Sequence, residues 1–120
     1  MKLHEIELYV RDPEASKHFY HEILGLPLNV DQKGLKVFRS GWEGLDVDVS
    51  VHHPGKISIS FLVRDLDALV EKLRFRGLEF EDPKDTHLGM RAINLLDPDG
   101  HRIEIQSPTD ESPDWLRSMV

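Results

Sequence analysis

The chain has 120 residues and no cysteine, and its 22 acidic and 15 basic residues give a formal net charge of −7. This length suits one domain with its own hydrophobic core, and the lack of cysteine rules out disulfide frameworks, CxxC redox pairs and thiol nucleophiles. The negative charge opposes binding to nucleic acid and to anionic membranes. Since no apolar leader or membrane-length apolar run is present, we expect a cytoplasmic protein.

The first predicted element is a strand, because Ile6, Leu8 and Val10 alternate with polar neighbours, as in a strand with one buried face. A helix follows, with Asp12 as its N-cap and proline next in the chain, and it ends at Gly25. The residues expected to face the sheet are Ala15, Phe19 and Ile23, together with Tyr20 and Leu24.

Three more strands complete the first half, over residues 28–31, 35–40 and 45–52, with glycine-containing turns between them. The segment His52-His-Pro-Gly55 interrupts this pattern, and we interpret it as a linker. A first module therefore covers about residues 1–53.

A second copy follows, since Ser58-Ile-Ser-Phe-Leu-Val-Arg-Asp65 repeats the pattern of Glu5-Ile-Glu-Leu-Tyr-Val-Arg-Asp12. Asp65 repeats the N-cap, and the helix ends at Gly77. Its sheet-facing stripe, at helical spacing, is Leu66, Leu69, Val70 and Leu73. The remaining predicted strands are 78–81, 90–96 and 102–106, with a hairpin turn at Asp97-Pro-Asp-Gly100, so a second module covers about residues 56–107.

The last segment, residues 108–120, starts as a polar tail and ends with apolar side chains that include Trp115 and Leu116. We expect this apolar end to dock, either on its own domain or on a second subunit.

Strand parity places polar side chains on the sheet face opposite the helices. If an approximate twofold axis relates the modules, it pairs Glu5 with Ser58 and Asp48 with Glu104, so we expect these four positions to converge. The alternative is that these residues are only the solvated side of a half-exposed sheet. The full predicted polar face is Glu5, Glu7, Tyr9, Asp46, Asp48, Ser50, His52, Ser58, Ser60, Arg102, Glu104 and Gln106.

Four segments resemble recurring segments of the glyoxalase/bleomycin-resistance/dioxygenase (vicinal oxygen chelate) superfamily: Val10-Arg-Asp12, Ile23-Leu-Gly-Leu26, Phe61-Leu-Val-Arg-Asp-Leu-Asp67 and Asp97-Pro-Asp-Gly-His-Arg-Ile-Glu-Ile105. The resemblance spans about residues 3–107. It implies an α+β fold in which two tandem βαβββ modules form a curved mixed sheet around a cleft. It also implies a small-molecule ligand or substrate and a homodimer.

Members of this superfamily often bind a divalent metal through His and Glu ligands on the first and last strands of each module. The corresponding positions here are Glu5, Asp48, Ser58 and Glu104, with Glu5 and Ser58 where histidine is common. The resemblance therefore implies an oxygen-only set, with Glu5, Asp48 and Glu104 as ligands, that suits Mg²⁺, Mn²⁺ or Ca²⁺. Without a metal, close carboxylates should raise the pKa of one of them, and Glu5 and Glu104 are then candidate catalytic groups.

Several residues are candidates for substrate contacts, and each has a structural alternative. Arg91 and Arg102 either bind a substrate carboxylate or balance neighbouring acids. Trp42, in a glycine-flanked loop, forms either a wall of the cleft or an interface anchor, and His87 lies in a loop ahead of a strand. The complete set of candidates is Ser58, Tyr9, Arg91, Arg102, Trp42 and His87.

Two functions fit these features. The first is a metal-dependent lyase or isomerase that acts on a substrate with vicinal oxygens. The second is a metal-free protein that sequesters a cationic small molecule in an acidic cleft, as the drug-sequestering members of the superfamily do. A pure interaction module is the third alternative, because a fold does not fix a function.

Overall fold

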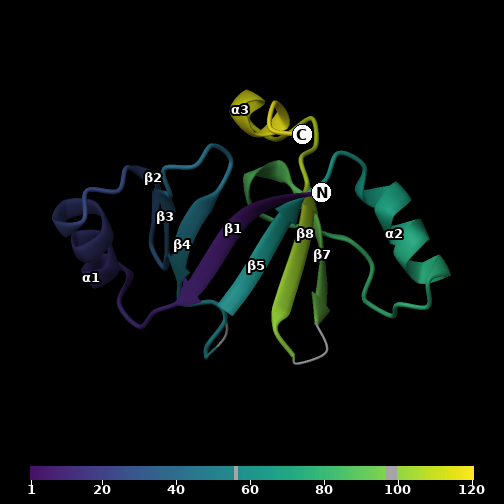
Figure 1. Cartoon of the computed structure of the whole chain (residues 1–120), viewed down its shortest axis with the longest axis horizontal. Coiled ribbons are helices and arrows are strands. Elements are labelled where there is room, and N and C mark those ends of the chain that lie inside the picture. The colour runs from purple at the N-terminus through teal and green to yellow at the C-terminus, as the bar shows by residue number, and fades with distance from the viewer. Residues whose placement is uncertain (56, 97–99) are drawn as a thin grey trace. The chain divides into compact units, whose positions relative to one another are not determined.

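A computed structural model describes residues 1–55, 57–96 and 100–120. Backbone contacts divide the chain into an N-terminal unit, Leu3–Ile59, and a C-terminal unit, Ser60–Val120 with Met1–Lys2. The chain runs twice through a strand, a helix and three further strands, so the predicted α+β fold of paired βαβββ modules is confirmed (Figure 1). No helix in the described part of the chain is long and apolar enough to span a membrane. The hairpin turn predicted at 97–100 involves residues 97–99, which lie outside the described residues.

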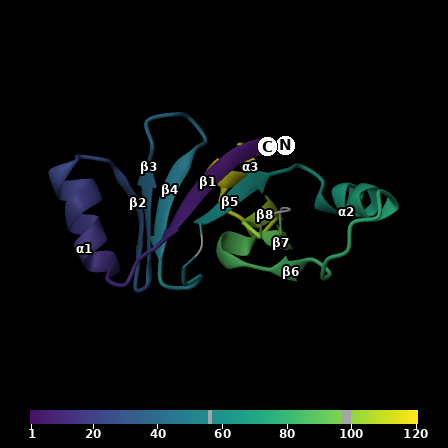
Figure 2. The ribbon, with the colours of Figure 1, turned by 60° about the horizontal axis from the view of Figure 1, so that its bottom comes forward.

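The N-terminal unit carries a mixed sheet with the strand order β2-β3-β4-β1 (Figure 2). β1 pairs with β4 in parallel, whereas β3 is antiparallel to both β2 and β4. The elements of this unit are β1 (Lys2–Tyr9), α1 (Pro13–Lys17), the π-helical segment η1 (His18–Ile23), β2 (Leu28–Gln32), β3 (Leu35–Arg39) and β4 (Asp46–Ser50).

The helical segment of this unit begins as predicted, because the Asp12 side chain accepts hydrogen bonds from two backbone N–H groups of the first turn. Its packing differs from the prediction. Tyr20 contacts the buried Phe38 of β3, with ring centroids 5.3 Å apart. Phe19, Ile23 and Leu24 are 46%, 61% and 56% exposed, and Ala15 is also exposed, so their assignment to the sheet-facing stripe was wrong. The π-helical bonding of η1 changes the angular spacing of its side chains, and an α-helical stripe does not apply there.

The C-terminal unit contains the strand order β5-β8-β7-β6, in which β7 is antiparallel to β6 and to β8. Helix α2 packs its predicted stripe on this sheet, with Leu66 and Val70 in a core that includes Ile93 and Ile105. The elements are β5 (Ile57–Leu62, which begins in the N-terminal unit), α2 (Leu66–Phe75), β6 (Lys84–Asp85), the 3₁₀ turn η2 (His87–Gly89), β7 (Arg91–Leu96), β8 (Arg102–Ser107) and α3 (Asp114–Arg117).

The strand predicted over residues 78–81 is absent, and the short strand β6 forms further along the chain. The carbonyl of Phe80 accepts a hydrogen bond from Arg74 at 3.5 Å, and the Arg74 guanidinium lies 5.0 Å from the Phe80 ring centroid. Pro83 follows, and proline has no N–H to donate to a strand. The contacts with Arg74 hold residues 78–81 against the end of α2, where they do not pair with the sheet.

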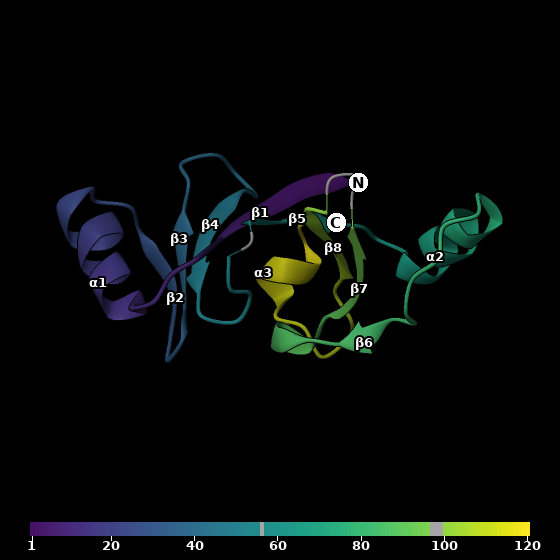
Figure 3. The same cartoon turned by 90° about the horizontal axis from the view of Figure 1, so that it is seen from below.

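The C-terminal segment docks on its own unit (Figure 3). Leu116 of α3 is fully buried against Leu62 and Met90. The Thr109 hydroxyl donates a 2.5 Å hydrogen bond to the carbonyl of Gly89. Gly89 also lies so close to the C-terminal segment that a Cβ atom on it would lie 2.7 Å from the Glu111 backbone. Of the two docking alternatives left by the sequence, the structure therefore supports docking within the chain.

Candidate functional site

A cluster of carboxyl groups lies on the polar face of the N-terminal sheet. Strand register places Glu5 beside Asp46 and Glu7 beside Asp48 on one face of the parallel pair β1 and β4. Glu5, Asp46 and Asp48 are each about 95% buried, with exposed fractions of 5%, 5% and 4%. For these acids, the alternative of a solvated sheet face is therefore wrong.

Asp48 has the most perturbed ionisation in this cluster. Its pKa is raised to about 11, first by burial and then by a hydrogen bond to Glu5 and the charges of Glu5, Glu7 and Asp46. At neutral pH the Asp48 carboxyl therefore keeps its proton and donates it in a hydrogen bond to Glu5. Its Oδ1 atom is buried and has no hydrogen-bond partner among the described residues.

Glu5 has a second neighbour in His4, which is 4% exposed. The Nδ1 atom of His4 lies 3.1 Å from the carbonyl oxygen of Gly44, so this nitrogen carries the proton that the carbonyl accepts. The other ring nitrogen, Nε2, lies 3.3 Å from Oε1 of Glu5. The loop carbonyl of Gly44 thereby orients the imidazole, and the Nε2 edge of the ring lies against the Glu5 carboxyl.

Glu7 is held by two groups near the end of β4. Its Oε1 atom accepts a hydrogen bond from the Ser50 hydroxyl and lies 3.3 Å from Nδ1 of His53. His53 belongs to the segment interpreted as a linker, so this segment also contributes to the acidic face.

Glu104 of the C-terminal unit has a contrasting environment. Its carboxylate accepts hydrogen bonds from the Arg102 guanidinium at 3.0 Å, from the Gln106 amide and from the Ser60 hydroxyl at 3.5 Å. Arg102 therefore balances the charge of this acid. Gln106 is 1% exposed, and its Oε1 has no hydrogen-bond partner in the described part of the chain.

Comparison with known proteins decides the family. The sequence profile of the Glyoxalase/Bleomycin resistance protein/Dioxygenase superfamily matches residues 2–105. The chain belongs to this superfamily. The resemblance found in the sequence is thus confirmed.

Three solved structures illustrate the shared superfamily fold. A superfamily member from Vibrio splendidus 12B01 is 18% identical with a TM-score of 0.65, covering 90% of this chain and 100% of its own. Methylmalonyl-CoA epimerase from Mycobacterium tuberculosis is 18% identical with a TM-score of 0.73, and the match covers 92% of this chain and 89% of the epimerase chain. A Mn(II)-bound glyoxalase from Novosphingobium aromaticivorans is 16% identical with a TM-score of 0.68, and the match covers 92% of this chain and 39% of the glyoxalase chain. At these identities the likeness establishes the fold alone.

A divalent metal, which superfamily members bind, would need a cluster of suitable side chains in this protein. Residues 1–55, 57–96 and 100–120 contain no group of three or more His, Asp or Glu side chains placed to hold a metal ion. In addition, the Glu104 carboxylate is occupied by hydrogen bonds from Arg102 and Gln106. The described residues therefore do not fit a superfamily metal centre.

The other residues predicted to contact a substrate have varied surroundings. Ser58 is fully buried on β5, whereas Tyr9 at the end of β1 is 36% exposed. Arg91 pairs with Asp67 at 3.3 Å. The remaining two candidates are Trp42, which is 79% exposed, and His87, which is exposed and has its Nδ1 3.1 Å from the Thr86 hydroxyl. Their roles as substrate contacts stay predictions.

His4 and His53 contact the acidic face but were not among the predicted site residues. Both could reach a cleft mouth, but strand parity assigns His4 to the face opposite Glu5 and His53 lies in the segment interpreted as a linker, so the sequence favoured a structural role for each. Glu7 and Asp46 were assigned to the polar face by parity, and the parallel pairing of β1 and β4 is the additional fact that places them beside Asp48 and Glu5.

Proposed function

We propose that this protein is a small-molecule enzyme of the isomerase or lyase type that transfers a proton at a substrate with vicinal oxygens. The observation that carries the proposal is the buried Glu5–Asp48 pair, in which Asp48 keeps its proton to about pH 11. Adjacent carboxyl groups in different protonation states are the usual basis of acid and base roles in one site.

In this proposal Glu5 accepts a proton from a carbon next to a substrate carbonyl. His4, fixed by the Gly44 carbonyl, keeps the Glu5 carboxyl in one orientation. Glu5 then returns this proton to the neighbouring carbon, so no net proton is gained or lost. Asp48 keeps its own proton in the hydrogen bond to Glu5, and its unpartnered Oδ1 is available to accept a hydrogen bond from a substrate hydroxyl. Burial strengthens these interactions because bulk water does not screen them.

Solvent exchange tests the proposal without knowledge of the natural substrate. The protein is incubated in D₂O with a panel of α-hydroxy and α-oxo carbonyl compounds, and NMR detects deuterium incorporation at carbon. We expect exchange for at least one compound, with a loss of about 10²- to 10⁴-fold in Glu5→Gln. Glu43→Gln, an exposed acid in a loop of the same unit, is the matched control. Exchange that survives in Glu5→Gln would contradict the assigned base.

The rival, metal-dependent case assigns Glu5, Asp48 and Glu104 as ligands. The described residues show no such centre, but a Mn(II)-bound glyoxalase has the same fold, so this case is tested as well. No step above depends on a metal. The same exchange assay with EDTA, followed by Mg²⁺, Mn²⁺ or Ca²⁺, separates the two cases. Unchanged activity after chelation is the expected result. Loss of activity with EDTA and recovery with a divalent ion would replace our scheme with a metal-dependent one.

Metal-free sequestration of a cationic molecule is the second candidate. It is favoured by the acids on the face of β1 and β4, which would attract positive charge. Calorimetry with basic glycopeptides tests it. Tight binding that depends on Glu7, without isotope exchange for any carbonyl compound, would favour this function over catalysis.

A homodimer is part of this proposal, with the half-exposed Trp115 as a candidate contact because its neighbour Leu116 is already used within the chain. Sedimentation equilibrium of the native chain and of Trp115→Ala measures the subunit number. A monomer at micromolar concentration would remove the dimer from the proposal.

A further inference from the structure

A groove with a volume of about 480 Å³ lies along α2 in the C-terminal unit. Its apolar walls come from Met1, from Val63 and from Ala68, Leu69 and Leu73 of α2. Leu69 and Leu73 are four positions apart and share one flank of the helix, and Ala68 directly precedes Leu69. Leu69 and Leu73 also belong to the stripe that packs on the sheet, but both are only half-buried, so part of their apolar surface stays open to the groove.

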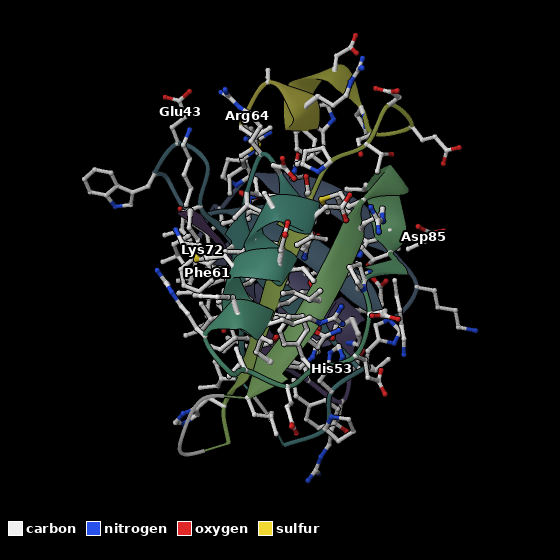
Figure 4. The ribbon with its side chains drawn as sticks, turned by 90° about the vertical axis from the view of Figure 1, so that its right-hand side faces the viewer. Glu43, His53, Phe61, Arg64, Lys72 and Asp85 are labelled. Carbon is white, nitrogen blue, oxygen red and sulfur yellow. The ribbon has the colours of Figure 1, made fainter. Side chains whose placement is uncertain are left out.

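Lys72 and Arg76 stand beside these apolar walls, one helical turn apart (Lys72 is labelled in Figure 4). Within the described residues neither side chain takes part in an ion pair, whereas Arg74 on the same helix is paired with Asp82 at 2.6 Å. The acid of the groove, Asp65, already accepts a 2.9 Å hydrogen bond from the backbone of Ala68 as the N-cap of α2. In a protein of net charge −7, this groove therefore has a locally cationic rim.

We propose that the groove binds a small amphipathic anion, a carboxylate that carries an apolar chain. The chain lies against Leu69, Leu73 and Val63, and the carboxylate contacts Lys72 and Arg76. Long cationic side chains suit this arrangement, because their methylene stems cover apolar surface while their charged ends reach an anion at its edge. All groove residues lie in the C-terminal unit, so this site is independent of the Glu5–Asp48 proposal.

Decanoate below its micelle concentration is the probe, and decanol is its uncharged counterpart. Methyl-selective NMR of the full chain is expected to show saturable shifts at Leu69, Leu73 and Val63 with decanoate. Each exposed charge contact contributes about two- to fivefold in affinity. The native chain should therefore bind decanol more weakly than decanoate by at least that factor, and the Arg76→Glu variant should bind decanoate more weakly than the native chain does by at least the same factor. Lys33→Glu, an exposed cation in the N-terminal unit, carries the same charge change and should leave binding unaltered.

Ala68→Glu provides a second variant that should fold, because Ala68 is exposed and an acid near a helix N-terminus is favourable. Its side chain would occupy the groove with a negative charge, and we expect it to abolish the decanoate shifts. Three results would overturn the proposal: no saturable shift, equal affinity for decanol and decanoate, or shifts that persist in both Arg76→Glu and Ala68→Glu. Shifts confined to the N-terminal unit would also do so.

Discussion

The two units have the same strand order but treat the acid on their last long strand differently. Asp48 of the N-terminal unit is surrounded by other acids and keeps its proton, whereas Glu104 of the C-terminal unit receives hydrogen bonds from Arg102, Gln106 and Ser60. Both carboxyl groups belong to corresponding strands of a repeated module. The difference shows that burial and the neighbouring side chains, and not the fold, decide whether such an acid is a reactive or a compensated group.

The largest expected effect concerns activity. Glu5→Gln should lower proton exchange by about 10²- to 10⁴-fold, since a general base is removed. Glu104→Gln, the matched change in the C-terminal unit, should have a much smaller effect on exchange, because the amide can retain part of the hydrogen bonding. Equal losses in the two variants would break the comparison and would restore Glu104 as a catalytic candidate.

The next effect concerns the C-terminal unit, whose core includes the docked end of the chain. Leu116→Ala should lower the free energy of unfolding by about 2–5 kcal/mol, because a fully buried leucine leaves a cavity. Trp115→Ala is the control, since Trp115 is 41% exposed. Urea titration measures both. Similar midpoints for Leu116→Ala and the native chain would show that the segment is not part of this core.

Asp48 should make stability depend on pH. Its folded-state pKa of about 11 lies above the ordinary value of 3.8, so the folded chain holds a proton that the unfolded chain releases. The free energy of unfolding should therefore fall as pH rises above about 4, with a limiting slope of about 1.4 kcal/mol per pH unit from this group. Asp48→Asn keeps a donor to Glu5 but cannot ionise.

Urea titrations between pH 5 and pH 9 compare native and Asp48→Asn proteins. We expect the variant to gain stability relative to the native chain as pH increases. If the difference in the free energy of unfolding between the two proteins stays constant from pH 5 to pH 9, Asp48 ionises normally. The acids Asp48 and Glu104 of the two units would then not differ in protonation.

The smallest effect compares the two helix caps. Asp12 accepts bonds from the N–H groups of Glu14 and Ala15 at 3.1 and 3.3 Å, whereas Asp65 accepts one from Ala68 at 2.9 Å. Replacement of either aspartate by alanine should cost about 0.5–2 kcal/mol. Thermal unfolding should show two small shifts of similar size, and a shift in only one variant would indicate that the other helix is held by its packing.

The sequence was sufficient for the features that depend on local chemistry. Alternating strands, the caps at Asp12 and Asp65, and the stripe of α2 are all governed by residue spacing. It was insufficient where distant segments compete for the same residues. The absent strand at 78–81 depends on Arg74, and the exposed Phe19 depends on π-helical bonding that no residue pattern indicated.

The same limit applies to the site. Parity identified Glu5 and Asp48 as members of one face, and like charges in proximity predicted a raised pKa. The sequence did not show that Gly44, in a loop, would orient His4 toward Glu5, because this contact joins segments 40 residues apart. The counter-ion role of Arg102 was one of two alternatives, and only the 3.0 Å distance to Glu104 distinguishes it.

The π-helical segment η1 has a consequence for handling the protein. It leaves Phe19, Ile23 and Leu24 between 46% and 61% exposed. At neutral pH the net charge of −7 keeps molecules apart, but near the isoelectric point of about 5.4 this repulsion vanishes. Colloidal stability should then be lowest around pH 5.4, where these apolar side chains can meet between molecules, and storage above pH 7 is preferable.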